Sequence, residues 1–335
     1  MTTRYCVPVD ATSPANLLEN ADQTRCNSPA GESSYSLTML QNMFASTSGN
    51  LLDRITQRWV QLTGRVVDFT AEHRWLDGPT GEPCGIGVEY FQEFARKHQL
   101  RIEPGIGLLE RFSFLRSSTF DPRQVSQHVL DFYERTSDYS LDAWSEWSGL
   151  FRPFGRMLAL IFSRRLQQLN VPLSPLDTSR GVSSEILRVS DPRSGRAMFT
   201  AWLRRLLGSG DVLYAGAYST CQLPSHEGAH VKVVFPLPNG SAIVIMRPMV
   251  HEDGSFSVAS HGKGFGDPGF YFTVHSRRGT HARYVRALRE SIRVYATEDG
   301  VVRADHVLSL FRLTFLRLHY RMVRKQGAEA RSGRS

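Results

Sequence analysis

The stretch from Ala282 to Met322 dominates the fold prediction, and it reads ARYVRALRESIRVYATEDGVVRADHVLSLFRLTFLRLHYRM. Two long runs of alternating apolar and polar residues flank a tight turn at Asp299-Gly300. An Asp-Gly pair between two alternating runs is one of the stronger short-range signals for a β-hairpin. The stretch therefore predicts two neighbouring antiparallel strands, each long enough to cross a barrel or a broad curved sheet.

The alternation also places two ionisable residues among apolar ones. Because the side chains of a strand repeat with a period of two, Glu290 falls on the apolar face of the first strand and His306 on that of the second. An ionisable group on such a face is costly unless it is paired. Two such groups can serve as a catalytic acid and base, which is one interpretation. The alternative is that each residue pairs with an arginine or lies at the rim of the sheet.

The rest of the second half of the chain has the same character. From Ser184 onward, short alternating runs are joined by turn residues, as at Pro238-Asn239-Gly240. We count nine strands, a spacing that is typical of an antiparallel sheet or barrel. The first half has helical periodicity instead, as in Ile55, Trp59 and Leu62. The prediction is an α+β protein whose helical N-terminal part packs on a C-terminal antiparallel β-barrel or strongly curved sheet of about nine strands.

The composition shifts along the chain predict five segments. They are a disordered leader (1–34), a mainly helical domain (35–170), a linker (171–183), a barrel-like domain (184–322) and a basic flexible tail (323–335).

Length and composition indicate a globular protein. The chain has 335 residues, of which 41% are hydrophobic. No run approaches the roughly 18 apolar residues of a membrane-spanning helix, and the first residues lack the pattern of a signal peptide. We therefore expect a cytoplasmic protein. The net charge of +8 is partly due to the basic C-terminal end, which we interpret as a solvated tail rather than a nucleic-acid-binding arm.

No motif specifies a metal or cofactor site. The four cysteines have no paired spacing, so we expect independent thiols. His226 and His230 stand four residues apart but bracket a glycine, which favours loop histidines over metal ligands. The glycine-rich segment 262–269 is followed by a strand-like run rather than a helix, so it predicts a mobile loop and not a phosphate loop. Lys263 in that loop is a candidate contact for an anionic ligand.

An aromatic segment from Trp144 to Phe162 leaves two interpretations open. The helix predicted from Phe154 to Leu169, which overlaps the second part of this segment, has an apolar body and a basic end, which suits either a core helix packed on the sheet or a helix that lies on anionic lipid. Core packing is the commoner outcome for one apolar stripe, and we favour it.

Residues 199–320 resemble a bacterial domain of unknown function. The resemblance is carried by Trp202-Leu203-Arg204-Arg205, by Phe235-Pro236-Leu237-Pro238-Asn239-Gly240, by Glu290-Ser291-Ile292-Arg293 and by Asp299-Gly300. That domain occurs alone or attached to reductase-like or membrane partners. The resemblance implies no established activity.

Three functions compete. The first is binding of a small hydrophobic metabolite inside the barrel, because closed sheets of about eight strands commonly enclose one apolar ligand. The second is a cofactor-independent isomerase, cyclase or hydratase in the same pocket. The third is an interaction or membrane-surface protein. The candidate catalytic residues are Glu290, His306 and Arg312, and the candidate ligand-binding residues are Arg247, Lys263, Trp202 and Tyr214. We expect neither a metal nor a cofactor.

Overall fold

A computed structural model describes residues 53–81, 89–148, 182–207 and 212–325. The predicted leader, most of the linker, most of the tail and the apolar-basic run 154–169 lie outside these described residues. The helices are α2 (Tyr90–Lys97) and α3 (Gln127–Glu134), with the short 3-10 turns η1 (Arg74–Leu76), η2 (Phe112–Leu115), η3 (Pro122–Gln124) and η4 (Thr136–Asp138). Residues 53–63 are also helical.

The strands account for most of the described chain. They are β1 (Arg65–Val67), β2 (Arg101–Pro104), β3 (Tyr139–Trp147), β4 (Val182–Ser190), β5 (Ala197–Leu206), β6 (Val212–Gln222), β7 (Ala229–Leu237), β8 (Gly240–Val250), β9 (Phe256–Ala259), β10 (Gly269–Ser276), β11 (Gly279–Val285), β12 (Leu288–Ala296), β13 (Val302–Leu310) and β14 (Leu313–Arg324).

These strands form one antiparallel sheet of 14 strands within the described residues, rather than the expected nine. The main path runs β2-β4-β5-β6-β7-β8-β9-β12-β13-β14-β3, and β10, β11 and β1 branch from β8. The two ends of the path, β2 and β3, do not pair with each other among the described strands. A closed barrel is therefore not confirmed, whereas the antiparallel sheet with a few helices is.

The predicted hairpin is present with the expected register. Strands β12 and β13 pair from Leu288↔Leu310 to Ala296↔Val302, and Gly300 in the turn has a left-handed φ of 76°. The second run is not one long strand, however. Phe311 and Arg312 have φ values of 49° and 70° and form a second turn, after which β14 pairs back on β13. Arg312 therefore lies in a turn and not on an apolar face of a strand.

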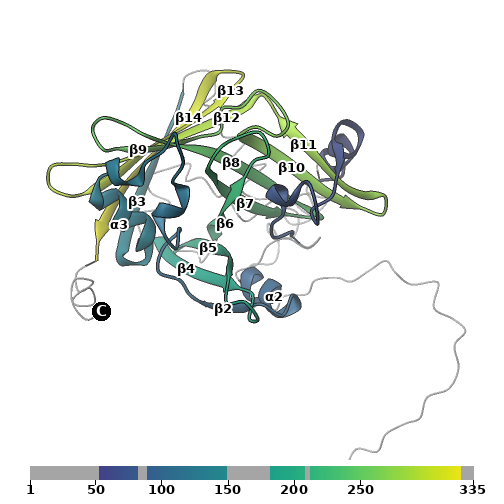
Figure 1. Ribbon diagram of the computed structural model, residues 1–335, viewed down its shortest axis with the longest axis horizontal. Coiled ribbons are helices and arrows are strands. Elements are labelled where there is room, and N and C mark those ends of the chain that lie inside the picture. Colours follow the sequence, from purple (N-terminus) through teal and green to yellow (C-terminus); the bar gives the residue numbers. More distant parts are fainter. Residues whose placement is uncertain (1–52, 82–88, 149–181, 208–211, 326–335) are drawn as a thin grey trace, which may run out of the picture.

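Strand β8 joins the two halves of the sheet (Figure 1). From Gly240 to Met246 it pairs with β7, and much of that part also pairs with β10, whereas from Arg247 to Val250 it pairs with β9. Pro248 lies within this second part and has no N–H for a ladder bond. Figure 1 shows the strand path rising from β2 and β4 through β8 to β12, β13 and β14.

Three strands come from the range that was predicted to be mainly helical. Strand β1 pairs with β11, β2 with β4 and β3 with β14. The part of the aromatic segment that the structure describes belongs to strand β3, not to a helix, and from Ser140 onward its residues alternate between exposed and partly buried positions. Residues 149–162 of that segment lie outside the described part. The boundary proposed at residue 170 stays a prediction.

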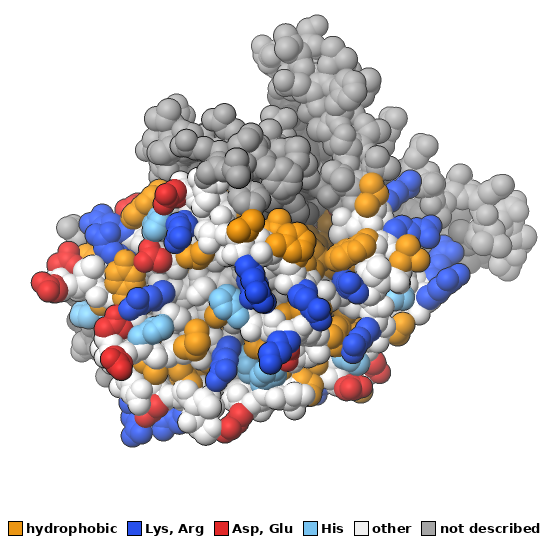
Figure 2. All heavy atoms as spheres, turned by 90° about the horizontal axis from the view of Figure 1, so that it is seen from above, with side chains coloured by type: hydrophobic (Ala, Val, Ile, Leu, Met, Phe, Trp, Pro, Cys, Tyr) orange, Lys and Arg blue, Asp and Glu red, His pale blue; other side chains and the backbone are white. Residues whose placement is uncertain are grey.

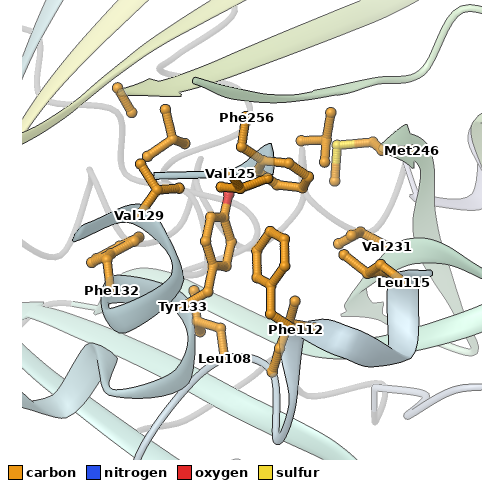
Figure 3. Close-up of a cluster of buried hydrophobic side chains, with 14 of the residues drawn as sticks. Leu108, Phe112, Leu115, Val125, Val129, Phe132, Tyr133, Val231, Met246 and Phe256 are labelled. Atoms are coloured by element: carbon orange, nitrogen blue, oxygen red, sulfur yellow. The ribbon is translucent and has the colours of Figure 1, made fainter. Parts of the chain in front are cut away.

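One hydrophobic core lies on the face of the sheet that we call the inner face. Trp202, Val233, Val294, Ala304 and Met322, from five different strands, belong to it together with residues of α3 and η2. In Figure 3 the aromatic side chains of this core point toward one another. The ring of Phe256 lies 4.8 Å from that of Phe112 and 5.3 Å from that of Tyr133, measured between centroids.

A second core lies on the opposite face of β4 to β8 and is covered by α2 and η1. Helix α2 buries Tyr90, Phe91 and Ala95, which its sequence places on one side. The ring of Phe91 packs against Phe199 of β5 at 6.1 Å. The sheet is thus buried on both faces in this half, which explains why its strands contain long apolar runs such as that of β8.

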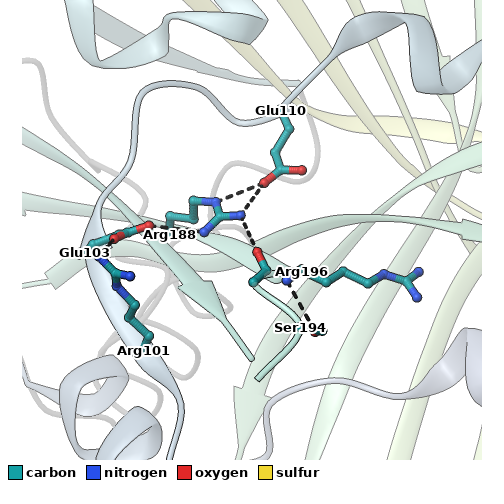
Figure 4. A network of polar contacts seen from close by, with 7 residues as sticks. Arg101, Glu103, Glu110, Arg188, Ser194 and Arg196 are labelled. Atoms are coloured by element: carbon teal, nitrogen blue, oxygen red, sulfur yellow. Dashed lines mark hydrogen bonds and ion pairs between the residues drawn. The ribbon is translucent and has the colours of Figure 1, made fainter. Parts of the chain in front are cut away.

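The edge strand β2 is tied to β4 by a charged network (Figure 4). The guanidinium of Arg188 donates to Glu103 of β2 at 3.1 Å and to Glu110 of the following loop at 2.9 Å. A third bond reaches the carbonyl of Gly195 at 2.9 Å. These contacts hold the edge and the loop against the end of the sheet.

Candidate functional site

Polar and aromatic side chains from five strands meet on the inner face. We call this set the interior polar cluster. Its members are Trp202 and Arg204 of β5, Tyr214 and Tyr218 of β6, Glu290 of β12, His306 of β13 and Tyr320 of β14. Some of these residues belong to the inner core or pack against it. The others stand an even number of positions from such a residue on the same strand, so the period of two points them to the inner face.

Glu290 and His306 form the acidic and basic end of the cluster. Their strands pair so that Ile292 faces His306, which makes Glu290 a diagonal neighbour of the histidine. The Oε2 atom of Glu290 lies 3.2 Å from Nε2 of His306. Glu290 is only 7% exposed. Its backbone is fixed as well, because the Glu290 N–H donates to the Ser260 hydroxyl at 2.8 Å.

Three tyrosines line the middle of the cluster. The hydroxyls of Tyr214 and Tyr218 lie 2.6 Å apart. Burial raises the pKa of Tyr214 well above its usual range and also raises the pKa of Tyr218. Burial raises the pKa of Tyr320 to about 12, although the nearby Arg204 opposes this shift. All three hydroxyls are therefore protonated at neutral pH and can donate as well as accept hydrogen bonds.

Tyr320 connects the two ends of the cluster. Its ring stacks on the imidazole of His306, with centroids 6.4 Å apart and planes 24° apart. The guanidinium carbon of Arg204 also lies over this ring, 5.9 Å from its centroid. The tyrosine side chain also interacts electrostatically with the Arg204 guanidinium. The carboxylate, the imidazole, the phenol and the guanidinium thus form one continuous group.

Arg204 lies at the other end and is 5% exposed. Its guanidinium carbon is 5.4 Å from the ring of Trp202, whose indole N–H donates to the Ser184 hydroxyl at 2.8 Å. Burial lowers the pKa of Arg204, and the surrounding tyrosines oppose that shift. The Nε and Nη2 atoms of this guanidinium are buried and have no hydrogen-bond partner among the described residues.

The structure brings together four of the residues that the sequence singled out and separates three. Glu290, His306, Trp202 and Tyr214 belong to the interior polar cluster. The other three are exposed and lie outside it, namely Arg312 in the turn between β13 and β14, Arg247 where β8 meets β9, and Lys263 in the loop before β10. The roles assigned to all seven stay predictions, but these three positions are not where a ligand in the cluster would lie.

Sequence reasoning missed Arg204, Tyr218 and Tyr320. The signal for the first two was a spacing. Arg204 is two residues from Trp202 and Tyr218 is four from Tyr214, so each pair shares a face of its strand. Tyr320 could be placed only after the second turn was known, because its register with Ala304 depends on the turn at Phe311.

The histidine pair lies outside this cluster, with His226 in the β6–β7 loop and His230 in strand β7 rather than in the expected loop. The rings of His226 and His230 are 5.6 Å apart, and His226 Nε2 lies 2.9 Å from the carboxylate of Asp267. Burial lowers the pKa of His230 to about 4, and the neighbouring His226 adds to the shift. Among the described residues no three His, Cys, Asp or Glu side chains come together as a metal site.

The surface seen from above in Figure 2 mixes residue types, with Lys and Arg side chains interspersed with histidines and hydrophobic side chains. None of the described helices is long and apolar enough to cross a membrane.

The chain is similar to the uncharacterized membrane protein YndJ of Bacillus subtilis (strain 168). The two are 30% identical over 239 residues, which is 70% of this chain. The chain covers 41% of the length of that relative. No family model and no solved structure matches the chain. The predicted resemblance to an uncharacterised bacterial protein is confirmed, whereas the expected cytoplasmic location stays a prediction.

Proposed function

We propose that the inner face of the sheet binds a small organic molecule that has an apolar body and one polar end. The observation that supports this proposal is the interior polar cluster itself. Most of the core positions on the inner face are apolar, and buried polar groups are normally kept only where they find partners. Seven polar or aromatic side chains at one place are more than the packing of a core requires, and they are typical of ligand sites.

The neighbours of the cluster suit the apolar body of such a ligand. Phe235 packs its ring against Tyr214 at 5.5 Å, and Trp202 packs against Tyr214 at 5.7 Å and against Tyr218 at 5.9 Å. Aromatic side chains offer large apolar contact surfaces, and Tyr and Trp add a polar atom. The polar end of the ligand would face Arg204, Tyr320 and the Glu290–His306 pair.

Native mass spectrometry of the purified protein, followed by extraction and identification of any retained molecule, tests the proposal. We expect one small organic molecule per chain in the wild type and its loss in a Trp202→Ala variant. The control is Trp144→Ala, because Trp144 is 44% exposed on β3 and stacks on His319 rather than in the cluster. An empty wild-type protein that also fails to bind added amphipathic molecules would refute the proposal.

The Glu290–His306 contact favours a second function, which is cofactor-independent proton-transfer chemistry at the same place. A carboxylate and an imidazole at 3.2 Å are within the distance at which an acid and a base exchange protons. Isomerisation, cyclisation or hydration of the bound molecule would use this pair. With the extracted molecule as substrate, Glu290→Gln and His306→Ala would retain binding but lose turnover, whereas unchanged turnover in both variants would refute the enzyme function.

A further inference from the structure

Arg204 is buried and, unlike several other arginines of the chain, has no acidic partner among the described residues. Arg188 pairs with two glutamates, Arg205 pairs with Glu185 at 3.3 Å, and Arg293 pairs with an aspartate. No ion pair connects Arg204 to a carboxylate of the described residues. Glu290, an acidic residue of the same cluster, contacts His306 instead. A buried cation without an opposite charge is costly, because removal from water is not offset by a close anion.

The two unpartnered nitrogens of Arg204 lie on the same edge of the guanidinium. Nε–H and one N–H of Nη2 point in the same direction, which is the arrangement that binds both oxygens of a carboxylate. The chain shows this arrangement elsewhere. Arg123 donates from Nε and Nη2 to the carboxylate of Asp121, with distances of 2.9 to 3.2 Å. In Arg204 the same edge is buried and has no partner within the described chain.

We propose that this edge of Arg204 binds the carboxylate of a small apolar acid. This inference rests on the proposed ligand-binding function and specifies the class of the ligand. The carboxylate would accept bidentate hydrogen bonds from Nε and Nη2, and Tyr320 lies close enough to the guanidinium to support it. The apolar part would lie against Trp202 and the neighbouring tyrosine rings.

The charges of the cluster favour a carboxylate over a phosphate. Arg204 supplies one permanent positive charge, which one carboxylate neutralises. A phosphate monoester carries more than one negative charge at neutral pH and would bring the excess close to Glu290. The three tyrosine hydroxyls are neutral donors and do not compensate for that excess charge.

A purely structural role for Arg204 makes a different prediction. In that case the rings of Trp202 and Tyr320 satisfy the cation by cation–π contact, and the side chain has no preference among ligands. Replacement of Arg204 would then change the stability of the protein without changing its selectivity for a charged head group.

Isothermal titration calorimetry with matched probes separates these possibilities. The full-length protein is titrated with decanoate, decanol and decyl phosphate, and with 2-naphthoate and 2-naphthalenemethanol as a second tail shape. The variants are Arg204→Gln, which removes the charge, and Arg204→Lys, which keeps the charge but cannot donate bidentate hydrogen bonds from Nε and Nη2. Arg205→Gln is the control, because Arg205 is adjacent to Arg204 in the sequence but its guanidinium already pairs with Glu185. Circular dichroism establishes that each variant is folded.

We expect the wild type and Arg205→Gln to bind at least one carboxylate about tenfold or more tightly than its alcohol, as bidentate charged hydrogen bonds predict. Decyl phosphate should bind more weakly than decanoate, and the selectivity should be lost in Arg204→Gln and reduced in Arg204→Lys. If acid and alcohol bind equally, or if folded Arg204→Gln keeps the selectivity, the carboxylate inference is wrong although ligand binding stands. If neither tail binds in any form, the inference and the proposed function both fail.

Discussion

The carboxylate of Glu290 and the imidazole of His306 are joined across the β12–β13 hairpin, with 3.2 Å between Oε2 and Nε2. The two residues stand sixteen positions apart in the sequence, and only an in-register hairpin makes them diagonal neighbours. The pair is buried, with side-chain exposures of 9% for Glu290 and 14% for His306. Water therefore screens this contact much less than it screens the surface ion pairs of the same strands.

A double-mutant cycle on Glu290→Gln and His306→Ala measures this contact. We expect a coupling energy of about 1–3 kcal/mol in the free energy of unfolding, because a buried hydrogen bond to a charged group contributes about that amount. The measurement is urea denaturation of the wild type, both single variants and the double variant.

The Asp305–His319 pair on β13 and β14 is the matched control for that cycle. Its Oδ1–Nδ1 distance is 2.7 Å, but its side chains are 42% and 28% exposed. The coupling between Asp305→Asn and His319→Ala should stay below about 1 kcal/mol, as for exposed pairs. A coupling at Glu290–His306 no larger than that of the control would contradict the picture of a buried, interacting pair.

Phe256 lies at the centre of the inner core and is fully buried. Its ring contacts those of Phe112, Phe120 and Tyr133, which come from the segment that packs on the sheet (Figure 3). Phe256→Ala should lower the free energy of unfolding by about 3–5 kcal/mol, because the cavity adds to the lost burial. Phe311→Ala, at a position that is 75% exposed, should change it by less than about 0.5 kcal/mol. Chemical denaturation of both variants checks the contrast.

The hairpin at the C-terminal end could be predicted from the sequence because its turn chemistry and its alternation agree. Asp299-Gly300 supplies a residue that tolerates a left-handed backbone, and the faces of Glu290 and His306 followed from the period of two. The next turn escaped notice because Phe311 and Arg312 adopt left-handed backbones without a glycine or asparagine. Tertiary pairing of β13 with β14 holds them there, and a local sequence pattern does not report such pairing.

The candidate site was predictable only in part for a related reason. Trp202 and Tyr214 could be chosen as inward-facing aromatic residues, but their position near Glu290 depends on how the sheet curves through β8. Arg204 was not selected because an arginine in a strand is usually exposed. Its burial follows from the convergence of β5, β6 and β14, which are more than a hundred residues apart at the extremes.

Gly240 provides a test of close packing between β8 and β10. A Cβ atom at this position would overlap the backbone carbonyl oxygen of Thr273, which cannot move without breaking the strand pairing. Gly240→Ala should therefore lower the free energy of unfolding by about 2–4 kcal/mol, in the range of severe overpacking. Gly264→Ala is the control, since a Cβ there meets nothing within 4 Å and the backbone needs no left-handed φ. Equal thermal stability of the two variants would contradict the close approach of these strands.

The buried imidazole of His230 should make the protein less stable as the pH falls below neutrality. Its folded-state pKa is lowered from 6.5 to about 4, first by burial and then by the neighbouring His226, with a smaller effect of Arg247. Between those two pH values the unfolded chain binds a proton that the folded chain does not, so the free energy of unfolding decreases as the pH falls. Well above pH 6.5 the imidazole is neutral in both the folded and the unfolded chain, so His230 then causes no change in the free energy of unfolding with pH.

Urea denaturation at intervals from pH 7.5 to pH 4 measures this dependence, with His230→Gln as the comparison. We expect the wild type to lose on the order of 1–3 kcal/mol more than the variant across this window, because each unit of pKa shift corresponds to about 1.4 kcal/mol. Two carboxylates with lowered pKa values, Asp253 and Asp267, do not mimic the effect. Hydrogen bonds to Ser255 lower the pKa of Asp253 to about 2. The pKa of Asp267 is also lowered, because its contacts with His226 and with loop N–H groups outweigh the effect of burial. Protonation of these two carboxylates therefore destabilises the fold only at more acidic pH. Parallel curves for wild type and variant would show that His230 is not the group that titrates.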